Sequence, residues 1–515
     1  MSLQPQIVSD EPDRLPVTLG RLADFAADPI LCMRALQETH GELAALQEDA
    51  QRLYFVFGPE YNRQVLSDAQ HFESQFFAIR GPRKSAQRRV TSGLLSMNGD
   101  EHKRHRRMVM GPFQKKALSE YHDHVVDLGR DMLAGWKPGQ VRDIGHDMTH
   151  YMLRLTTAIL FGVDVPEFSD RLGMLTERWV SLNHRIGTAA LISNLQLSRQ
   201  YDELLLAAEE LEVAVRELIA LRRGGTLGQD VLSLLLRAYD ENGGISDDQL
   251  VGHIALLFGA AHLTSAHTLT WTLFLLAQHP EVMQSLHGEL TETLGGQAPR
   301  GDQLDSLTAL DRVIRESMRI LPASAYSQRV VGSPVSLGPF QLSRGAVVIF
   351  SQFMTHHSPQ VFPEPAKFIP DRWKTWSAAS HPEEARHPGC PVTEGRNSPP
   401  MTCGAGISVP PGLSPYAYLP FGAGPRMCIG AALGMMQLKI SLPMILSRFK
   451  LSVVPWTTVN GRVTSTMLYP TSPLMMRVDR HDGEFDSVPV SGNIHSLLDL
   501  PPATMPDVIP FRRVA

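Results

Sequence analysis

The sequence has 515 residues, of which 43% are hydrophobic and 20% are charged, and its formal net charge is −5. This composition provides apolar material for a large core, and length alone predicts two to four domains. Four cysteines are too few and too irregularly spaced for a disulfide framework, and no apolar signal-peptide segment opens the chain. We therefore expect a reducing, cytoplasmic setting.

In chain order, the sequence is rich in predicted helices up to about residue 320. Residues 167–186 and 204–223 show apolar side chains at i, i+3 and i+4. A further helix is predicted between Ser306 and Pro322. Short strand-like runs follow at 328–354, 449–455 and 465–478. Residues 374–416 and the tail after Val478 are predicted to be loosely structured.

Residues 249–280 carry no Asp, Glu, Lys or Arg, and this uncharged segment is long enough for a membrane span. The segment contains four histidines, among them His253, His262 and His267, and no second such segment exists. Ser246 and Gln249 predict a capping box at its start, with Ile245 and Leu250 as a hydrophobic staple, and Pro280 closes it. A helix of this length spans about 50 Å. We interpret it as a buried central helix, with a membrane span as the alternative.

Cys428 lies in the stretch "FGAGPRMCIG", where Gly422 and Gly424 permit a tight loop and an apolar helix follows. Backbone N–H groups and the positive end of a helix stabilise a thiolate. Gly430 leaves room for a flat group against the backbone. The residues alone therefore indicate a nucleophile or a metal ligand, and the alternative is a buried structural thiol.

This stretch resembles the Phe-x-x-Gly-x-Arg-x-Cys-x-Gly haem loop of the cytochromes P-450, the haem-thiolate monooxygenases. The resemblance implies that Cys428 is the axial ligand of the haem iron. It also implies that Phe421 shields the sulfur, that Gly430 lies against the haem and that Arg426 pairs with a haem propionate. A thiolate ligand favours O–O cleavage in this family.

Glu316 and Arg319 form a Glu-x-x-Arg pair on one helix face. Periodicity alone predicts a solvated ion pair, because apolar residues occupy the opposite face. The resemblance instead implies that both residues join Arg372 of "FIPDRW" in a buried polar network beneath the haem. Such a cluster is costly unless it is fully paired, so its role is structural.

His102 and Arg106, four residues apart, resemble the propionate-binding pair of the family, and Arg329 matches a further propionate arginine. The alternative for each is a surface basic residue. The surrounding residues 80–116 hold eleven Lys and Arg but two acids. Aromatic residues are not interleaved there, which argues against nucleic acid. A docking face for an acidic electron-transfer partner fits better.

The uncharged helix matches the family's oxygen-binding pattern imperfectly. The resemblance places Ala260 against the haem, Ala261 where glycine is common, and Thr264 as the catalytic hydroxyl. Leu263 stands where the family has an acid that relays protons. Candidates to replace this acid are Thr264 with ordered water, an inward-turned His262, or a polar group of the substrate.

These observations predict a mainly α protein with small β-sheets and the cytochrome P-450 fold, in which the long helix crosses the molecule next to the haem. Residues 1–480 form one domain, with a loop insertion at about 376–412, and 481–515 are a C-terminal extension. We expect haem b as cofactor, with electrons passing from NAD(P)H through a separate ferredoxin reductase and ferredoxin. No membrane anchor is expected.

The predicted reaction is insertion of one atom of dioxygen into a hydrophobic small molecule such as a terpenoid, a fatty acid or a polyketide. Three alternatives are a peroxide-driven oxygenase, an oxygen-independent haem-thiolate isomerase or dehydratase, and a domain that has lost its haem. Cys390, Cys403 and His387 lack the close Cys pairs of zinc sites, so a zinc site is disfavoured.

Overall fold

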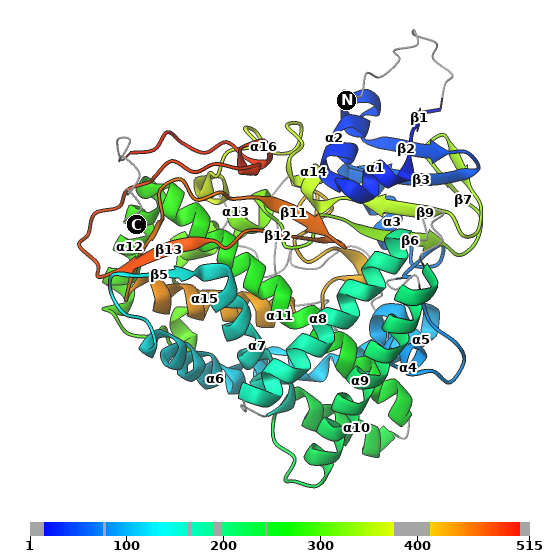
Figure 1. Cartoon of the computed structure of the whole chain (residues 1–515), viewed down its shortest axis with the longest axis horizontal. Coiled ribbons are helices and arrows are strands. Elements are labelled where there is room, and N and C mark those ends of the chain that lie inside the picture. The colour runs from blue at the N-terminus through cyan, green and yellow to red at the C-terminus, as the bar shows by residue number, and fades with distance from the viewer. Residues whose placement is uncertain are drawn as a thin grey trace, which may run out of the picture.

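The computed structural model describes residues 15–75, 79–162, 166–189, 197–242, 245–374 and 413–504. The predicted insertion at 376–412, with His387, Cys390 and Cys403, lies outside the described residues. A large helical body occupies one side of the molecule and a mixed β-sheet the other, as Figure 1 shows.

The helices form most of the molecule and account for its core. Their bounds are α1 Leu22–Ala27, α2 Pro29–His40, α3 Pro59–Ser67, α4 Ala86–Val90, α5 Gly99–Val109, α6 Lys115–Ala134, α7 Ile144–Phe161, α8 Pro166–Ala189, α9 Leu197–Arg223, α10 Val231–Asn242, α11 Asp247–Gln278, α12 Pro280–Leu294, α13 Thr308–Ile320, α14 Gln352–His356, α15 Ala431–Leu446 and α16 Ile494–Leu497. Short 3₁₀ turns are η1 Leu94–Ser96, η2 Gly111–Phe113, η3 Gly301–Gln303, η4 Pro370–Trp373 and η5 Gly424–Arg426.

The largest sheet has the strand order β1-β2-β3-β9-β6-β4, so strands from the N-terminal region lie beside strands from the middle of the chain. The smaller sheets are β10-β13-β5, β11-β12 and β7-β8. The strand bounds are β1 Val17–Leu19, β2 Leu43–Glu48, β3 Gln51–Val56, β4 Phe72–Glu73, β5 Gln140–Asp143, β6 Ser327–Val331, β7 Val335–Leu337, β8 Phe340–Leu342, β9 Val347–Phe350, β10 Lys450–Val453, β11 Gly461–Thr464, β12 Met467–Pro470 and β13 Met475–Asp479.

Helix α11 is the predicted central helix. Its N-terminus has the predicted capping box, in which the Ser246 hydroxyl accepts from Gln249 N and the Gln249 side chain accepts from Ser246 N. It packs against α4, α7, α8, α9, α13 and α15. Of the described helices it alone is long and apolar enough to cross a membrane by length and composition, and most of its residues are buried inside the protein. Its apolar character therefore serves contacts on all sides.

Helix α13 begins at Thr308, two residues after the predicted start at Ser306. The carboxylate of Glu289, from α12, accepts hydrogen bonds from Ala309 N (2.7 Å) and Leu310 N (3.0 Å). This acceptor from a neighbouring helix satisfies the first free N–H groups, so a tertiary contact sets the boundary. The residues around Thr308 therefore do not by themselves predict where α13 begins.

The C-terminal extension is packed against the domain as far as it is described, to Thr504, in contrast to the predicted loose tail. Asp499 forms a parallel bridge with Lys367, and Ser491 forms one with Thr458. Ile494 is fully buried. The tail therefore adds backbone hydrogen bonds and apolar contacts to the domain, which its Pro- and Ser-containing sequence does not signal.

Candidate active site

The loop that carries Cys428 is held in a tight conformation by glycine. Gly422 and Gly424 have φ values of +69° and +71°, in the left-handed region. A Cβ at Gly424 would meet the backbone oxygen of Leu66 at 2.2 Å, so no other residue fits there. Cys428 N donates to Phe421 O (2.8 Å), which closes the loop just before α15.

The thiol of Cys428 is accessible to solvent, yet burial raises its pKa. A hydrogen bond from the backbone of Gly430 and the charge of Arg106 act in the opposite direction and lower the pKa. A sulfur that is both accessible and surrounded by protein faces an internal space. The loop therefore presents this thiol to that space with two thiolate-stabilising groups beside it.

The middle of α11 is accessible in the same way. Ala260 is exposed, and Ala261, Leu263 and Thr264 are partly exposed, although residues 250–256 before them and 266–278 after them are buried. Thr264 Oγ1 donates to Ala260 O (2.9 Å). We call Ala260–Thr264 the α11 window.

The α11 window and the Cys428 loop meet at α15. A Cβ built on Gly434, in α15, would lie 3.7 Å from the Phe421 ring and 4.0 Å from Ser265 Oγ, and Ser265 is the residue after the window. Ser265 also contacts Gln437 of α15 at 3.4 Å. The accessible thiol and the accessible helix face therefore border one region of the interior.

One histidine and three arginines lie beside this region: His102, Arg106, Arg329 and Arg426. Arg106 Nη2 donates to Met427 O (2.7 Å), next to the cysteine. Burial and Arg426 lower the pKa of Arg329 to about 9. Burial, followed by the three arginines, lowers the pKa of His102 to about 3.

These arginines are bound to backbone and amide oxygens rather than to carboxylates. Arg426 Nη2 donates to Met97 O (2.6 Å) and to the Asn98 side chain, and its buried Nε has no hydrogen-bond partner. Among the described residues no carboxylate forms an ion pair with any of the three. Converging buried cations without an anion are costly, so the site fits a ligand with two carboxylates, as haem has.

Glu316, Arg319 and Arg372 are brought together as one buried network. Glu316 and Arg319 have no exposed side-chain surface, so the solvated ion pair predicted by periodicity is wrong. Arg319 donates to Glu316 through Nε and Nη2, and Arg372 donates through Nε, all at 2.9 Å. Residues 313–320 of α13 are buried on every face. Apolar periodicity cannot distinguish a buried face from an exposed one in such a helix.

Sequence reasoning missed two members of this network. Trp373 Nε1 donates to Glu316 (2.9 Å). His356 Nδ1 contacts Arg319 O (3.2 Å), and its Nε2 accepts from Leu419 N (2.7 Å), two residues before Phe421. The network is therefore connected to the Cys428 loop. Trp373 adjoins Arg372 in the sequence, but nothing local marks His356.

His262 turns away from the α11 window. Its ring is fully buried, its Nδ1 lies 3.0 Å from Phe258 O, and its Nε2 lies 3.9 Å from the Glu177 carboxylate of α8. The inward-turned His262 considered above is therefore not the conformation observed. Leu263 remains the side chain at the position of the missing acid.

The basic run 80–116 is divided among several elements. Lys103, Arg104 and Arg107 are exposed on α5, the helix whose Arg106 reaches the Cys428 loop. Residues 80–90 instead lie around α4, which packs on α9 and α11. Only the α5 part lies beside the candidate site's cysteine loop.

Comparison with known proteins agrees with this arrangement. The family model for cytochrome P450 matches residues 12–478, so the chain belongs to the cytochrome P450 family and is an oxidoreductase of the monooxygenase type. That family implies a haem cofactor.

Two relatives come from Streptomyces melanosporofaciens. Cyclooctat-9-en-7-ol 5-monooxygenase is 29% identical, with 88% of this chain and 92% of the relative aligned. Cyclooctatin synthase is also 29% identical, at 90% and 94% coverage. Pentalenene oxygenase of Streptomyces avermitilis is 26% identical, at 91% and 97% coverage.

The fold is also that of a solved structure, the haem domain of cytochrome P450DA. The TM-score is 0.73 at 22% sequence identity, and the match covers 91% of this chain and 98% of that one. The predicted mainly α cytochrome P-450 fold is therefore confirmed.

Proposed function

We propose that the protein is a haem-thiolate monooxygenase in which Cys428 is the axial ligand of the iron. The observation that carries this proposal is the accessible Cys428 beside three partly buried arginines, none of which forms an ion pair with a carboxylate among the described residues. When bound, haem b supplies dioxygen activation and transfer of one oxygen atom to the substrate.

The residues around the thiol have distinct proposed tasks. Arg106, Arg329 and Arg426 hold the two haem propionates, and His102, neutral at physiological pH, contributes a hydrogen bond. Phe421 shields the sulfur on the α15 side. The N–H of Gly430 and the charge of Arg106 favour the thiolate over the thiol.

Across the internal space from Cys428, Ala260 provides a flat surface for the cofactor, and the Thr264 hydroxyl holds a proton close to the cofactor. Thr264 donates its hydroxyl hydrogen to Ala260 O, so its oxygen lone pairs are free to accept from an ordered water. Leu263 can neither donate nor accept, so proton delivery rests on Thr264 and that water, or on a polar group of the substrate.

We propose a terpenoid substrate. The relatives named for cyclooctat-9-en-7-ol and for pentalenene support this class. The accessible side chains of the α11 window are those of Ala260, Ala261, Leu263 and Thr264, and all but Thr264 are apolar, which suits a hydrocarbon skeleton. Hydroxylation or epoxidation of such a skeleton is the expected reaction.

Electrons are proposed to come from NAD(P)H through a ferredoxin reductase and a ferredoxin. The exposed cations Lys103, Arg104 and Arg107 of α5 support docking of an acidic partner beside the Cys428 loop. Because Leu263 replaces the acid, a peroxide-driven oxygenase or an oxygen-independent isomerase is the second candidate.

The deciding experiment is the absorption spectrum of the reduced, CO-bound protein. We expect the red-shifted Soret band of a thiolate ligand in the wild type and in the matched control Cys32→Ala, and its loss in Cys428→Ala and Cys428→His. Retention of the band without Cys428 refutes the ligand assignment. Product formation that needs neither oxygen nor peroxide would favour the isomerase.

A further inference from the structure

The C-terminal extension is fastened to the domain by residues 493–499, here called the C-terminal support. Asn493 exchanges two hydrogen bonds with the backbone of Gly461 in β11, both at 2.8 Å. The backbone oxygen of Ser496 accepts from Arg34 of α2 (3.0 Å). The buried side chains of the segment are those of Ile494, Leu497 and Leu498. The segment includes α16, which Figure 1 shows in red at the edge of the molecule, and it is a fixed part of the domain surface.

The C-terminal support ends on the loop formed by residues 363–367. Asp499 N donates to Ala366 O (2.8 Å), and Asp499 forms a parallel bridge with Lys367. Within this loop Glu364 has a φ of +48°, in the left-handed region that is unfavourable for residues other than glycine. Such a conformation persists where the surrounding structure holds it. The loop therefore depends on contacts from outside, and the extension supplies one of them.

The other four backbone oxygens of the loop bind the two arginines of the Glu316 network. These oxygens are those of Pro363, Glu364, Pro365 and Lys367. Arg372 donates to the first two, at 2.9 Å and 3.3 Å, and Arg319 donates to the last two, at 2.8 Å and 3.0 Å. Because the Arg319 side chain has no exposed surface, its N–H groups need these oxygens in place. The hydrogen bond from the extension therefore holds a loop that satisfies the network.

The network continues from Arg319 to the Cys428 loop. Arg319 Nη1 also donates to His356 O (2.9 Å), and His356 Nδ1 lies 3.2 Å from Arg319 O. The other ring nitrogen of His356 accepts from Leu419 N (2.7 Å), and Leu419 O accepts from Gly422 N (3.0 Å). A continuous series of polar contacts therefore joins the arginine to the glycine turn of the Cys428 loop, and the members of such a network stabilise one another.

We propose that the C-terminal support is a positioning element of the haem-thiolate site. By binding Ala366 O it holds the 363–367 loop on Arg319, and through His356 the network holds the Cys428 loop in the conformation that presents the thiolate to the haem. Loss of the support weakens thiolate ligation before the fold itself is lost. The proposal rests on the proposed function, because it assigns a support to the same thiolate.

The test compares Asp499→Pro, which lacks the N–H group, with Asp499→Ala, which keeps it. Leu498 has a φ of −154° and a ψ of 161°, an extended conformation that a following proline accepts. The haem-loaded proteins are held in urea below the unfolding midpoint, and the reduced, CO-bound spectrum is followed over time. The red-shifted Soret band should be lost about fivefold faster in Asp499→Pro, the factor that corresponds to one typical hydrogen bond. Asp499→Ala should stay within about twofold of the wild type, because only an exposed charge is removed.

Circular dichroism of the same samples separates positioning from a general loss of stability. Tyr121→Phe is the control for a hydrogen bond lost elsewhere, because Tyr121 of α6 donates to Gln229 O (3.1 Å). In Tyr121→Phe the interval between loss of the Soret band and loss of the helical signal should equal that of the wild type, whereas in Asp499→Pro it should widen. Faster amide exchange of residues 366–369 and 419–422 in Asp499→Pro is the second readout.

A chain that ends at Leu498 is a second variant without this donor, and a chain that ends at Thr504 is its control, because it keeps the described contacts of the extension. These two chains decide the question in the same assay where Asp499→Pro does not fold. Equal rates of band loss in each variant and its control would overturn the proposal. A normal thiolate spectrum with such equal rates refutes the support alone, whereas absence of that spectrum in the wild type refutes the proposed function itself.

Discussion

Replacing Glu316 by Gln preserves the shape of the side chain but removes its charge and exchanges one acceptor oxygen for a donor. Its Oε2 accepts from Arg319 Nε and Trp373 Nε1, and its Oε1 accepts from Arg319 Nη2, Arg372 Nε and Ile369 N, each at 2.9 Å. In either orientation, the new amide N–H₂ therefore faces at least two donors. No rotation of the amide restores the network.

The size of the effect follows from those contacts. A hydrogen bond to a charged group contributes about 1.5–3 kcal/mol, so losing two corresponds to about 3–6 kcal/mol. Removing one partner of a buried ion pair typically costs about 3–5 kcal/mol. We therefore expect Glu316→Gln to lower the free energy of unfolding by about 3–5 kcal/mol, because Arg319 is left without its carboxylate in a site closed to solvent.

The assay is urea unfolding of the haem-loaded protein, followed by circular dichroism and by tryptophan fluorescence. Glu60→Gln is the matched control, because Glu60 forms an ion pair with Arg63 in which both side chains are more than half exposed. This control should leave the unfolding midpoint nearly unchanged. The reasoning is refuted if Glu316→Gln loses no more stability than Glu60→Gln.

Three further outcomes are expected. Product formed per reducing equivalent should rise in Leu263→Glu and collapse in Thr264→Ala, since general acid help is typically worth about 10²–10⁴ in rate, and full coupling in Thr264→Ala would contradict this. Burial lowers the pKa of His253 from 6.5 to about 3, so unfolding takes up a proton between these pH values. The free energy of unfolding should therefore fall as the pH drops from 6.5 towards 3, and it should fall less steeply in His253→Gln. Equal slopes for the two proteins in urea unfolding at several pH values would count against this prediction. Deleting residues 481–515 should lower the midpoint of thermal unfolding, because the Asp499–Lys367 bridge is lost, and an unchanged midpoint would show the extension to be dispensable.

Sequence reasoning succeeded where the determinants are close together in the chain. The Cys428 loop depends on glycines within six residues, and the capping box of α11 depends on two residues three apart. These features are fixed by local backbone geometry, so their residue types report on them directly. The buried position of α11 also followed, because its histidines and hydroxyl-bearing residues suit a core better than lipid.

Contacts between distant segments could not be predicted in the same way. Asn98 binds Arg426 across 328 residues, and Gln87 binds Trp179 across 92. Each residue alone reads as a surface polar group, since nothing nearby indicates its partner. Glu316 is instructive, because apolar periodicity placed it in solvent and only the family motif placed it in the interior.

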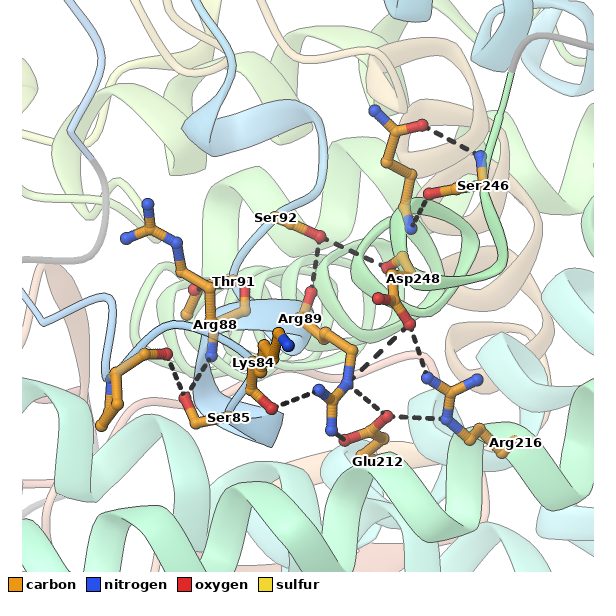
Figure 2. Close-up of polar contacts among 12 residues, drawn as sticks. Lys84, Ser85, Arg88, Arg89, Thr91, Ser92, Glu212, Arg216, Ser246 and Asp248 are labelled. Atoms are coloured by element: carbon orange, nitrogen blue, oxygen red, sulfur yellow. Dashed lines mark hydrogen bonds and ion pairs between the residues drawn. The ribbon is translucent and has the colours of Figure 1, made fainter.

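The basic run shows how the fold changes the meaning of a charge count. One part, with Lys103, Arg104 and Arg107, is exposed beside the Cys428 loop, whereas Arg89 is paired with Glu212 of α9 (Figure 2). Salt screens the exposed cations of α5 strongly, whereas the ion pair of Arg89 with the buried Glu212 is screened less. Higher salt should therefore reduce docking of an acidic electron donor and leave the Arg89–Glu212 pair in place. The salt dependence of turnover with a redox partner thus measures the docking face.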